Sequence, residues 1–163
     1  MAKNKEEKTN VMRVLEQKKI AYTAHTYPHE EGMAVDGVTV AKSMGFDPAI
    51  VFKTLVARGA SKQYYVFDVP VAENLDLKKA AKAVGEKAIE MIHQKELLPL
   101  TGYVHGGCSP VGMKKLFPTV FHETAENLET MIVSAGKIGY QVELAPHDLA
   151  ALVRAKFADI IVE

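Results

Sequence analysis

The 163-residue chain is long enough to bury one hydrophobic core, and its 48% hydrophobic and 25% charged residues are ordinary for a globular protein. Lysine plus arginine and aspartate plus glutamate number 20 each, so the chain lacks the basic excess of proteins that bind nucleic acid unaided. One cysteine excludes an intramolecular disulfide, and no apolar run approaches the ~20 residues that span a bilayer.

We therefore expect a single domain over residues 1–163 in the cytoplasm, without a membrane segment. Residues 1–8 contain no apolar core of the kind a secretory signal needs, and we expect them to be frayed. Periodicity and turn residues predict, in order, a helix at 8–19, a strand at 20–27, a loop at 30–37, a helix at 39–44, a helical turn after Asp47, and strands at 51–58 and 63–69.

The second half continues with short elements. We expect a helix at 77–84, a strand at 87–92, a helical turn at 94–98 stopped by Pro99, a strand end at 103–104, strands at 119–122, 130–134 and 140–144, a helix from Pro146 and an edge strand at 158–162. Asp76 is expected to cap its helix, with Leu77 inside and Gly85 at the end. Without regular βαβ alternation, the pattern indicates an α+β fold with a mixed, barrel-like sheet surrounded by short helices.

Lys53 is the first candidate functional residue. It lies in the middle of a predicted strand, on a face shared with Val51 and Leu55. A lysine in this position either extends outward along the surface or points into a solvated cleft. In the cleft, its ammonium group would be a fixed positive charge for a phosphate or an ester oxygen.

A glycine-rich segment at residues 101–115 is the second candidate. Gly106 and Gly107 allow backbone conformations closed to other residues, and the main-chain N–H groups that follow can converge on a carbonyl oxygen or an anion. A loop without a ligand is the alternative. Cys108 is a candidate nucleophile if the neighbouring amides lower the pKa of its thiol, with His105 or His122 as a base.

The sequence contains no pattern that indicates a metal or a cofactor. His25 and His29 are four residues apart, but Pro28 between them argues against one helix presenting both side chains. Neither a Walker loop nor a dinucleotide fingerprint is present. We therefore expect neither a bound metal nor a cofactor.

Four spaced motifs together resemble the YbaK/EbsC family, the free-standing relatives of the editing domain of bacterial prolyl-tRNA synthetase. They are V-F-K-T-L at 51–55, V-P-V at 69–71 with L-D-L-K-K-A-A-K-A at 75–83, T-G-Y-V-H-G-G-C-S-P-V-G at 101–112 and V-S-A-G-K at 133–137. The resemblance runs from about Tyr22 to Asp159. It implies a mixed β-barrel with flanking helices.

The resemblance also implies an enzyme that deacylates mischarged Cys-tRNA(Pro). Lys53 matches the essential lysine of the family, and Gly106 begins its G-x-x-x-P loop. The substrate thiol would attack its own ester, so no protein nucleophile would be required. The residues implied to bind substrate are Tyr27, Phe52, Thr54, Gly107, Cys108, Ser109, Pro110, Ser134, Gly136 and Gln141.

Some expectations remain open at this stage. Certain family members carry an acidic residue where this chain has Gln141, so a carboxylate role at that position is in doubt. The partners implied are the CCA end of mischarged tRNA and prolyl-tRNA synthetase. Deacylation of another amino acid by water, such as alanine or serine, and a non-catalytic module that binds aminoacyl-tRNA or a synthetase are the alternatives.

Overall fold

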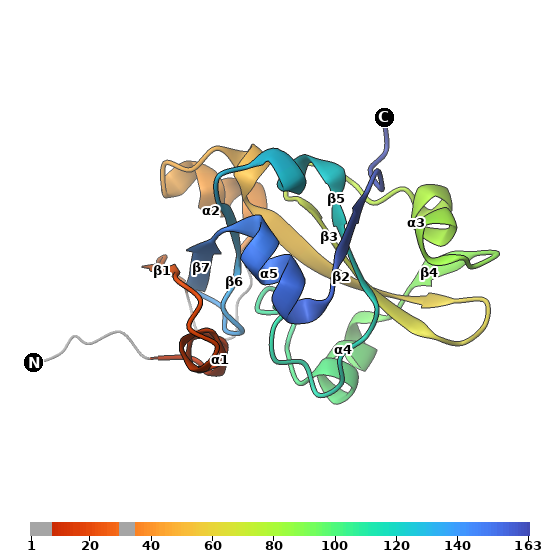
Figure 1. The fold of residues 1–163 in the computed structure, drawn as a ribbon, viewed down its shortest axis with the longest axis horizontal. Helices are drawn as coiled ribbons and strands as arrows, with labels where there is room; N and C mark the ends of the chain where they lie inside the picture. The colour runs from red at the N-terminus through yellow and green to blue at the C-terminus, as the bar shows by residue number, and fades with distance from the viewer. Residues whose placement is uncertain (1–7, 30–34) are drawn as a thin grey trace, which may run out of the picture.

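The computed structural model describes residues 8–29 and 35–163, which form two β-sheets and several short helices (Figure 1). The helices are α1 (Asn10–Gln17), α2 (Gly37–Ser43), α3 (Leu77–Val84), α4 (Gln94–Thr101) and α5 (Pro146–Val153), with single 3-10 turns η1 (Pro48–Ile50) and η2 (Glu123–Asn127). The strands are β1 (Thr23–Thr26), β2 (Phe52–Gly59), β3 (Tyr64–Pro70), β4 (Ile89–Met91), β5 (Thr119–His122), β6 (Met131–Ser134), β7 (Tyr140–Leu144) and β8 (Lys156–Ala158). Predictions for residues 1–7 and 30–34 fall outside the described part of the chain.

The strands form a larger sheet in the order β4-β2-β3-β5-β8 and a smaller one in the order β1-β7-β6. β2 and β3 form the expected antiparallel hairpin, whereas β5 pairs in parallel with both β3 and β8. One parallel bridge, between Val51 and Ile132, joins the two sheets. The mixed α+β fold is therefore confirmed. The expected barrel does not close among the described residues, because they remain two separate sheets.

Most of the core lies between the two sheets. Its buried side chains come from both sheets and from the helices that cover them, as Leu15 of α1, Phe121 of β5 and Leu149 of α5 illustrate. In Figure 1, α5 crosses in front of the region where the sheets meet, and α3 lies with β4 at the opposite end from α1. A second cluster packs α3 against the outer face of the larger sheet. Each β2 residue therefore faces either the main core or the α3 side.

Local helix signals explain α3. The Asp76 carboxylate accepts hydrogen bonds from the N–H groups of Lys78 and Lys79, and Gly85 ends the helix in the left-handed conformation with φ of 74°. The prediction that Leu77 is inside is wrong, because its side chain is 41% exposed. Residue 77 is the first in the helix, and the buried stripe begins one turn later.

Several other boundaries differ from the predictions. Pro99 lies inside α4 instead of stopping it, because the turn after it is closed by the Gly102 N–H, which donates to Leu98 O at 2.8 Å. Tyr103 does not belong to a strand; its N–H donates to the Thr101 hydroxyl oxygen at 3.0 Å. The last strand, β8, ends at Ala158, where the predicted edge strand was expected to begin.

Among the described residues, none of the helices combines the length and apolar character needed to cross a membrane. The longest helices in residues 8–29 and 35–163 have eight residues.

Candidate active site

A cavity of about 520 Å³ lies beside the first half of β2. Its walls come from β2, the start of α2, the loop after α4, and the ends of β6 and β7. The lining residues are Tyr27, Val35, Asp36, Gly37, Val40, Val51, Phe52, Lys53, Thr54, Leu55, Val71, Leu97, His105, Gly106, Cys108, Ser134, Tyr140 and Gln141. Eight residues expected in the site therefore meet around one space: Tyr27, Phe52, Lys53, Thr54, Gly106, Cys108, Ser134 and Gln141.

The cavity occupies an open edge of the larger sheet. Among the described residues, β4 pairs with β2 only from Ala57 to Gly59, and at the other end of this edge the bridge from Val51 to Ile132 brings β6 beside the start of β2, which leaves the edge between these two contacts open. The N–H of Val71 donates to Val51 O, and the N–H of Gly59 donates to Gln63 O. Because paired residues alternate in an antiparallel ladder, this register directs the main-chain N–H and C=O of Thr54 away from β3, toward the open edge.

Lys53 reaches this cavity from the middle of an apolar strand. Its side chain is half-buried, and burial lowers the pKa of the ammonium group, while the carboxylates of Asp36 and Glu73 act in the opposite direction. Asp36 also lines the cavity, at the start of α2. The site thus presents a partly desolvated cation whose positive form is supported by two nearby acids. Of the two alternatives for this lysine, the structure shows the cleft.

The glycine loop forms the wall that contains Gly106 and Cys108. Gly106 has φ of 90°, a conformation that strongly favours glycine, and the N–H of Gly107 donates to Val104 O at 3.0 Å. The Gly107 amide is therefore engaged in the turn itself. A Cβ at Gly107 would lie 3.1 Å from the main-chain N of Ile138, so glycine allows the loop to pack against the turn between β6 and β7.

Four of the expected site residues do not border the cavity and lie in the segments that form its wall. They are Gly107, Ser109, Pro110 and Gly136. The Ser109 hydroxyl oxygen is buried and accepts the N–H of Val111. Gly136, with φ of 93°, packs against the ring of Tyr103. These residues shape the loop and the β6–β7 turn.

A buried acid lies one layer behind the cavity wall. Asp68 of β3 is opposite Thr54 of β2, and its Oδ1 accepts the hydrogen of the Thr54 hydroxyl. Its Oδ2 has no hydrogen-bond partner among the described residues. Burial raises the pKa of Asp68 to about 7, although the Thr54 hydrogen bond acts to lower it.

The environment of Cys108 does not favour a nucleophilic thiolate. Burial, as the larger cause, and the negative charge of Asp68, as the smaller one, raise the pKa of the Cys108 thiol to about 12. His122 is engaged elsewhere, where its Nδ1 accepts the N–H of Ile160 at 3.3 Å. Within residues 8–29 and 35–163, no histidine is hydrogen-bonded to the sulfur. The reactive-cysteine hypothesis therefore has no geometric support.

The smaller sheet supplies polar groups on the opposite wall. Gln141 is only 7% exposed, and its side-chain oxygen Oε1 has no hydrogen-bond partner in the described part of the chain. Ser134, its partner in the β6–β7 ladder, also lines the cavity. Tyr27 is held next to them by its N–H, which donates to Gly139 O at 2.9 Å. A buried amide oxygen at a cavity wall is a ready acceptor for a ligand.

Among the polar side chains that line the cavity, sequence reasoning missed Asp36 and Tyr140, and it named His105 only as a possible base for Cys108. The signal for Asp36 was present: its carboxylate accepts the N–H of Thr39, so it is the N-cap of α2, which begins two residues earlier than predicted. Across the described residues, no group of three or more His, Cys, Asp or Glu side chains is arranged to hold a metal ion.

Comparison with known proteins adds to this geometry. The sequence pattern of the family described as the aminoacyl-tRNA editing domain matches residues 29–152. A protein of Enterococcus faecalis, named as a candidate Cys-tRNA(Pro)/Cys-tRNA(Cys) deacylase, EbsC, is 46% identical over 161 residues, or 98% of each chain.

Solved structures share the fold. A candidate trans-editing enzyme for prolyl-tRNA synthetase superposes with a TM-score of 0.79 at 25% identity, over 94% of this chain and 95% of its own. A hypothetical protein that is only 18% identical has a TM-score of 0.82, over 93% of this chain and 99% of its own.

Proposed function

The chain belongs to the aminoacyl-tRNA editing domain family, and on this basis we propose that it releases cysteine from mischarged Cys-tRNA(Pro), acting in trans. The observation that carries the proposal is the convergence of Lys53 with the Gly106–Cys108 loop on one cavity. The 46% identity to a relative named for this activity supports the choice of substrate.

The need for such an activity is physical. Cysteine and proline have similar volumes, and a binding pocket discriminates small apolar differences by only ~1–3 kcal/mol. A synthetase for proline therefore mischarges some tRNA with cysteine, and a second site has to remove it. The cavity of about 520 Å³ has the size of pockets that hold small ligands, such as an aminoacylated terminal nucleoside.

We assign the polar groups of the cavity to parts of this ligand. The ammonium group of Lys53 faces the ester, where it stabilises negative charge that develops on the carbonyl oxygen. The unpartnered Oε1 of Gln141 accepts a hydrogen bond from the α-ammonium group of the substrate. Tyr27 and Phe52 supply apolar surface at the cavity wall.

The bond rearrangement uses the thiol of the substrate. Its sulfur attacks the ester carbonyl carbon, a C–S bond forms as the C–O bond to the tRNA breaks, and the thiol proton ends on the released ribose hydroxyl. The products are tRNA and a cyclic cysteine thiolactone. The protein contributes orientation and charge stabilisation instead of a nucleophile. This agrees with the raised pKa of Cys108, about 12, which keeps that thiol neutral at neutral pH.

Selection of the tRNA requires help from a partner. With 20 basic and 20 acidic residues, the chain has no charge excess with which to bind RNA strongly. We infer that association with prolyl-tRNA synthetase brings the mischarged end to the cavity. Deacylation of Cys-tRNA(Pro) at low enzyme concentration should therefore be faster when prolyl-tRNA synthetase is added.

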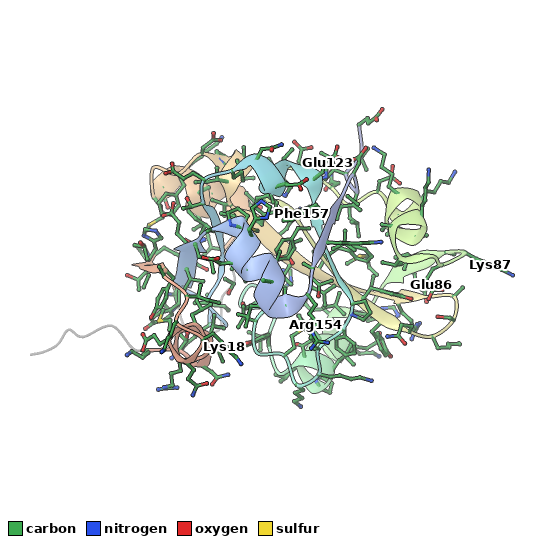
Figure 2. All side chains as sticks on the ribbon, viewed as in Figure 1. Lys18, Glu86, Lys87, Glu123, Arg154 and Phe157 are labelled. Atoms are coloured by element: carbon green, nitrogen blue, oxygen red, sulfur yellow. The ribbon has the colours of Figure 1, made fainter. Side chains whose placement is uncertain are left out.

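A Lys53→Ala variant tests the assignment. Loss of the charge should reduce the rate of Cys-tRNA(Pro) deacylation by about 100-fold or more, as removal of an oxyanion donor does in other enzymes. Lys87→Ala is the matched control, because the Lys87 side chain is exposed and extends from the far end of the molecule, away from α2 (Figures 1 and 2). A rate for Lys53→Ala within twofold of the wild type would refute the role of Lys53.

The choice of substrate is tested in the same assay. Ala-tRNA(Pro) and Ser-tRNA(Pro) lack the thiol, so their deacylation should be much slower than that of Cys-tRNA(Pro). Equal rates for the three substrates would indicate attack by water. No deacylation of any of them by the wild-type protein would leave a binding module as the explanation.

A further inference from the structure

Asp68 is a buried ionisable group that the proposed reaction does not use. It lies in a central strand, is fully buried, and has one carboxylate oxygen bonded to Thr54 and the other without a hydrogen-bond partner among the described residues. Burying a carboxylate without a cation is costly, because the interior does not replace its hydration. A residue that costs stability in this way calls for a functional explanation.

The connection to the cavity runs through Thr54. Thr54 lines the cavity, and its hydroxyl donates its only hydrogen to Asp68. A hydroxyl group has one hydrogen and two lone pairs, and an ionised carboxylate can only accept. With its hydrogen committed to Asp68, Thr54 can offer the cavity only lone pairs. It is therefore set to accept a hydrogen bond from the ligand.

The charges around Asp68 indicate what kind of ligand group donates the hydrogen bond to Thr54. Within the described part of the chain, Thr54 of β2 acts on Asp68 and Cys108 of the loop is affected by its charge, and the residue opposite it on β5 is Phe121. Lys53 is influenced by acids other than Asp68. A buried negative charge without its own cation, one layer behind an acceptor, favours a cationic donor over a neutral one.

We propose that Asp68 is a positioning residue, which holds the Thr54 hydroxyl as an acceptor for the α-ammonium group of the aminoacyl ligand. This inference rests on the proposed function and deepens it. Gln141 accepts one of the three ammonium hydrogens, and Thr54 accepts a second. Asp68 itself does not touch the ligand.

Two stable ligand analogues test the inference in binding measurements by calorimetry. One is 3′-deoxy-3′-(L-cysteinylamino)adenosine, in which an amide replaces the ester. The other is the 3-mercaptopropanoyl analogue, which lacks only the amino group. Asp68→Val removes both carboxylate oxygens and suits a strand, and it should weaken binding of the cysteinyl analogue about 10- to 100-fold, the effect of one lost hydrogen bond to a charged group. Binding of the analogue without the amino group should be unchanged.

Two further variants separate positioning from a general structural role. Asp68→Asn keeps an oxygen that can accept from Thr54 but removes the charge, so it should recover the part of the affinity that depends on the orientation of the Thr54 hydroxyl and bind between the wild type and Asp68→Val. The double variant Thr54→Val/Asp68→Val should bind no more weakly than Thr54→Val alone, because Asp68 acts through Thr54. Should the Asp68→Val protein not fold, Asp68→Ala provides the same comparison.

Specific outcomes overturn the inference. Equal weakening of both analogues, or additive losses in the double variant, would show that Asp68 does not act through Thr54 on the ammonium group. Failure of the wild-type protein to bind the cysteinyl analogue would instead refute the proposed function, and this inference with it.

Discussion

Replacing Asp68 with asparagine should make the protein more stable at alkaline pH and should flatten the pH dependence of its stability. The carboxyl group is fully buried, and burial raises its pKa from the ordinary 3.8 to about 7. Because the folded state binds this proton more tightly than the unfolded state, the stabilisation by the proton is complete below about pH 4. It is lost progressively as the pH rises through 7.

The magnitude follows from the shift. About three pKa units at 1.36 kcal/mol each correspond to about 4 kcal/mol between the acidic and alkaline limits. Between pH 5 and pH 8 the wild-type protein should lose about 2.5 kcal/mol more than Asp68→Asn, since the amide is neutral throughout. Asparagine has nearly the same shape, and its side chain can still pair with Thr54, so the comparison isolates the charge.

Urea unfolding at several pH values, followed by far-UV circular dichroism, measures this difference. All other titrating groups are common to both proteins, so their contributions cancel. Glu129→Gln serves as the control, because it removes an exposed carboxylate and changes the net charge of the protein by the same amount. Parallel curves for the wild type and Asp68→Asn would refute the argument, because they would mean that Asp68 has the same pKa in the folded and unfolded chains.

Two further predictions concern the cavity wall. Gly136→Ala should lower the melting temperature much more than Gly45→Ala. Both glycines have positive φ, but a Cβ at Gly136 would lie 3.0 Å from Tyr103 Cε1, whereas a Cβ at Gly45 would meet no atom within 4 Å. Equal shifts of the melting temperature in thermal unfolding would contradict this reasoning. Cys108→Ala should deacylate Cys-tRNA(Pro) within about threefold of the wild-type rate, because the neutral thiol is not the nucleophile, and a loss as large as that of Lys53→Ala would contradict it.

The features that sequence reasoning predicted correctly depend on local signals. The β2–β3 hairpin follows from alternating residues on both sides of a short turn, and α3 follows from the Asp76 cap and the Gly85 stop. Lys53 was noticeable because the ammonium group of a lysine in an apolar strand has to reach solvent or a solvated cleft. In each case, the cause lies within a few residues of the effect.

The features that were missed depend on contacts between distant segments. The parallel pairing of β3 with β5 joins Asp68 to Phe121, and it covers Asp68 in a way that its neighbours in sequence do not reveal. Pro99 is a helix breaker by propensity, yet α4 continues through it because hydrogen bonds on the following turn hold the chain. The position of the Gly106 loop opposite β2 likewise follows from the packing of the whole domain.

The alternation of side chains along β2 explains how a cation and a buried acid serve one cavity without neutralising each other. Thr54 and its partner Asp68 project to the main-core side of the sheet, while Lys53 starts on the other side and also lines the cavity. If Lys53 paired directly with Asp68, the two charges would satisfy each other, and neither would be available to a ligand. Separation by one residue leaves the Lys53 charge for the ester, and it leaves the charge of Asp68, through Thr54, for the ammonium group. A shift of the β2 register by one residue would abolish both roles at once.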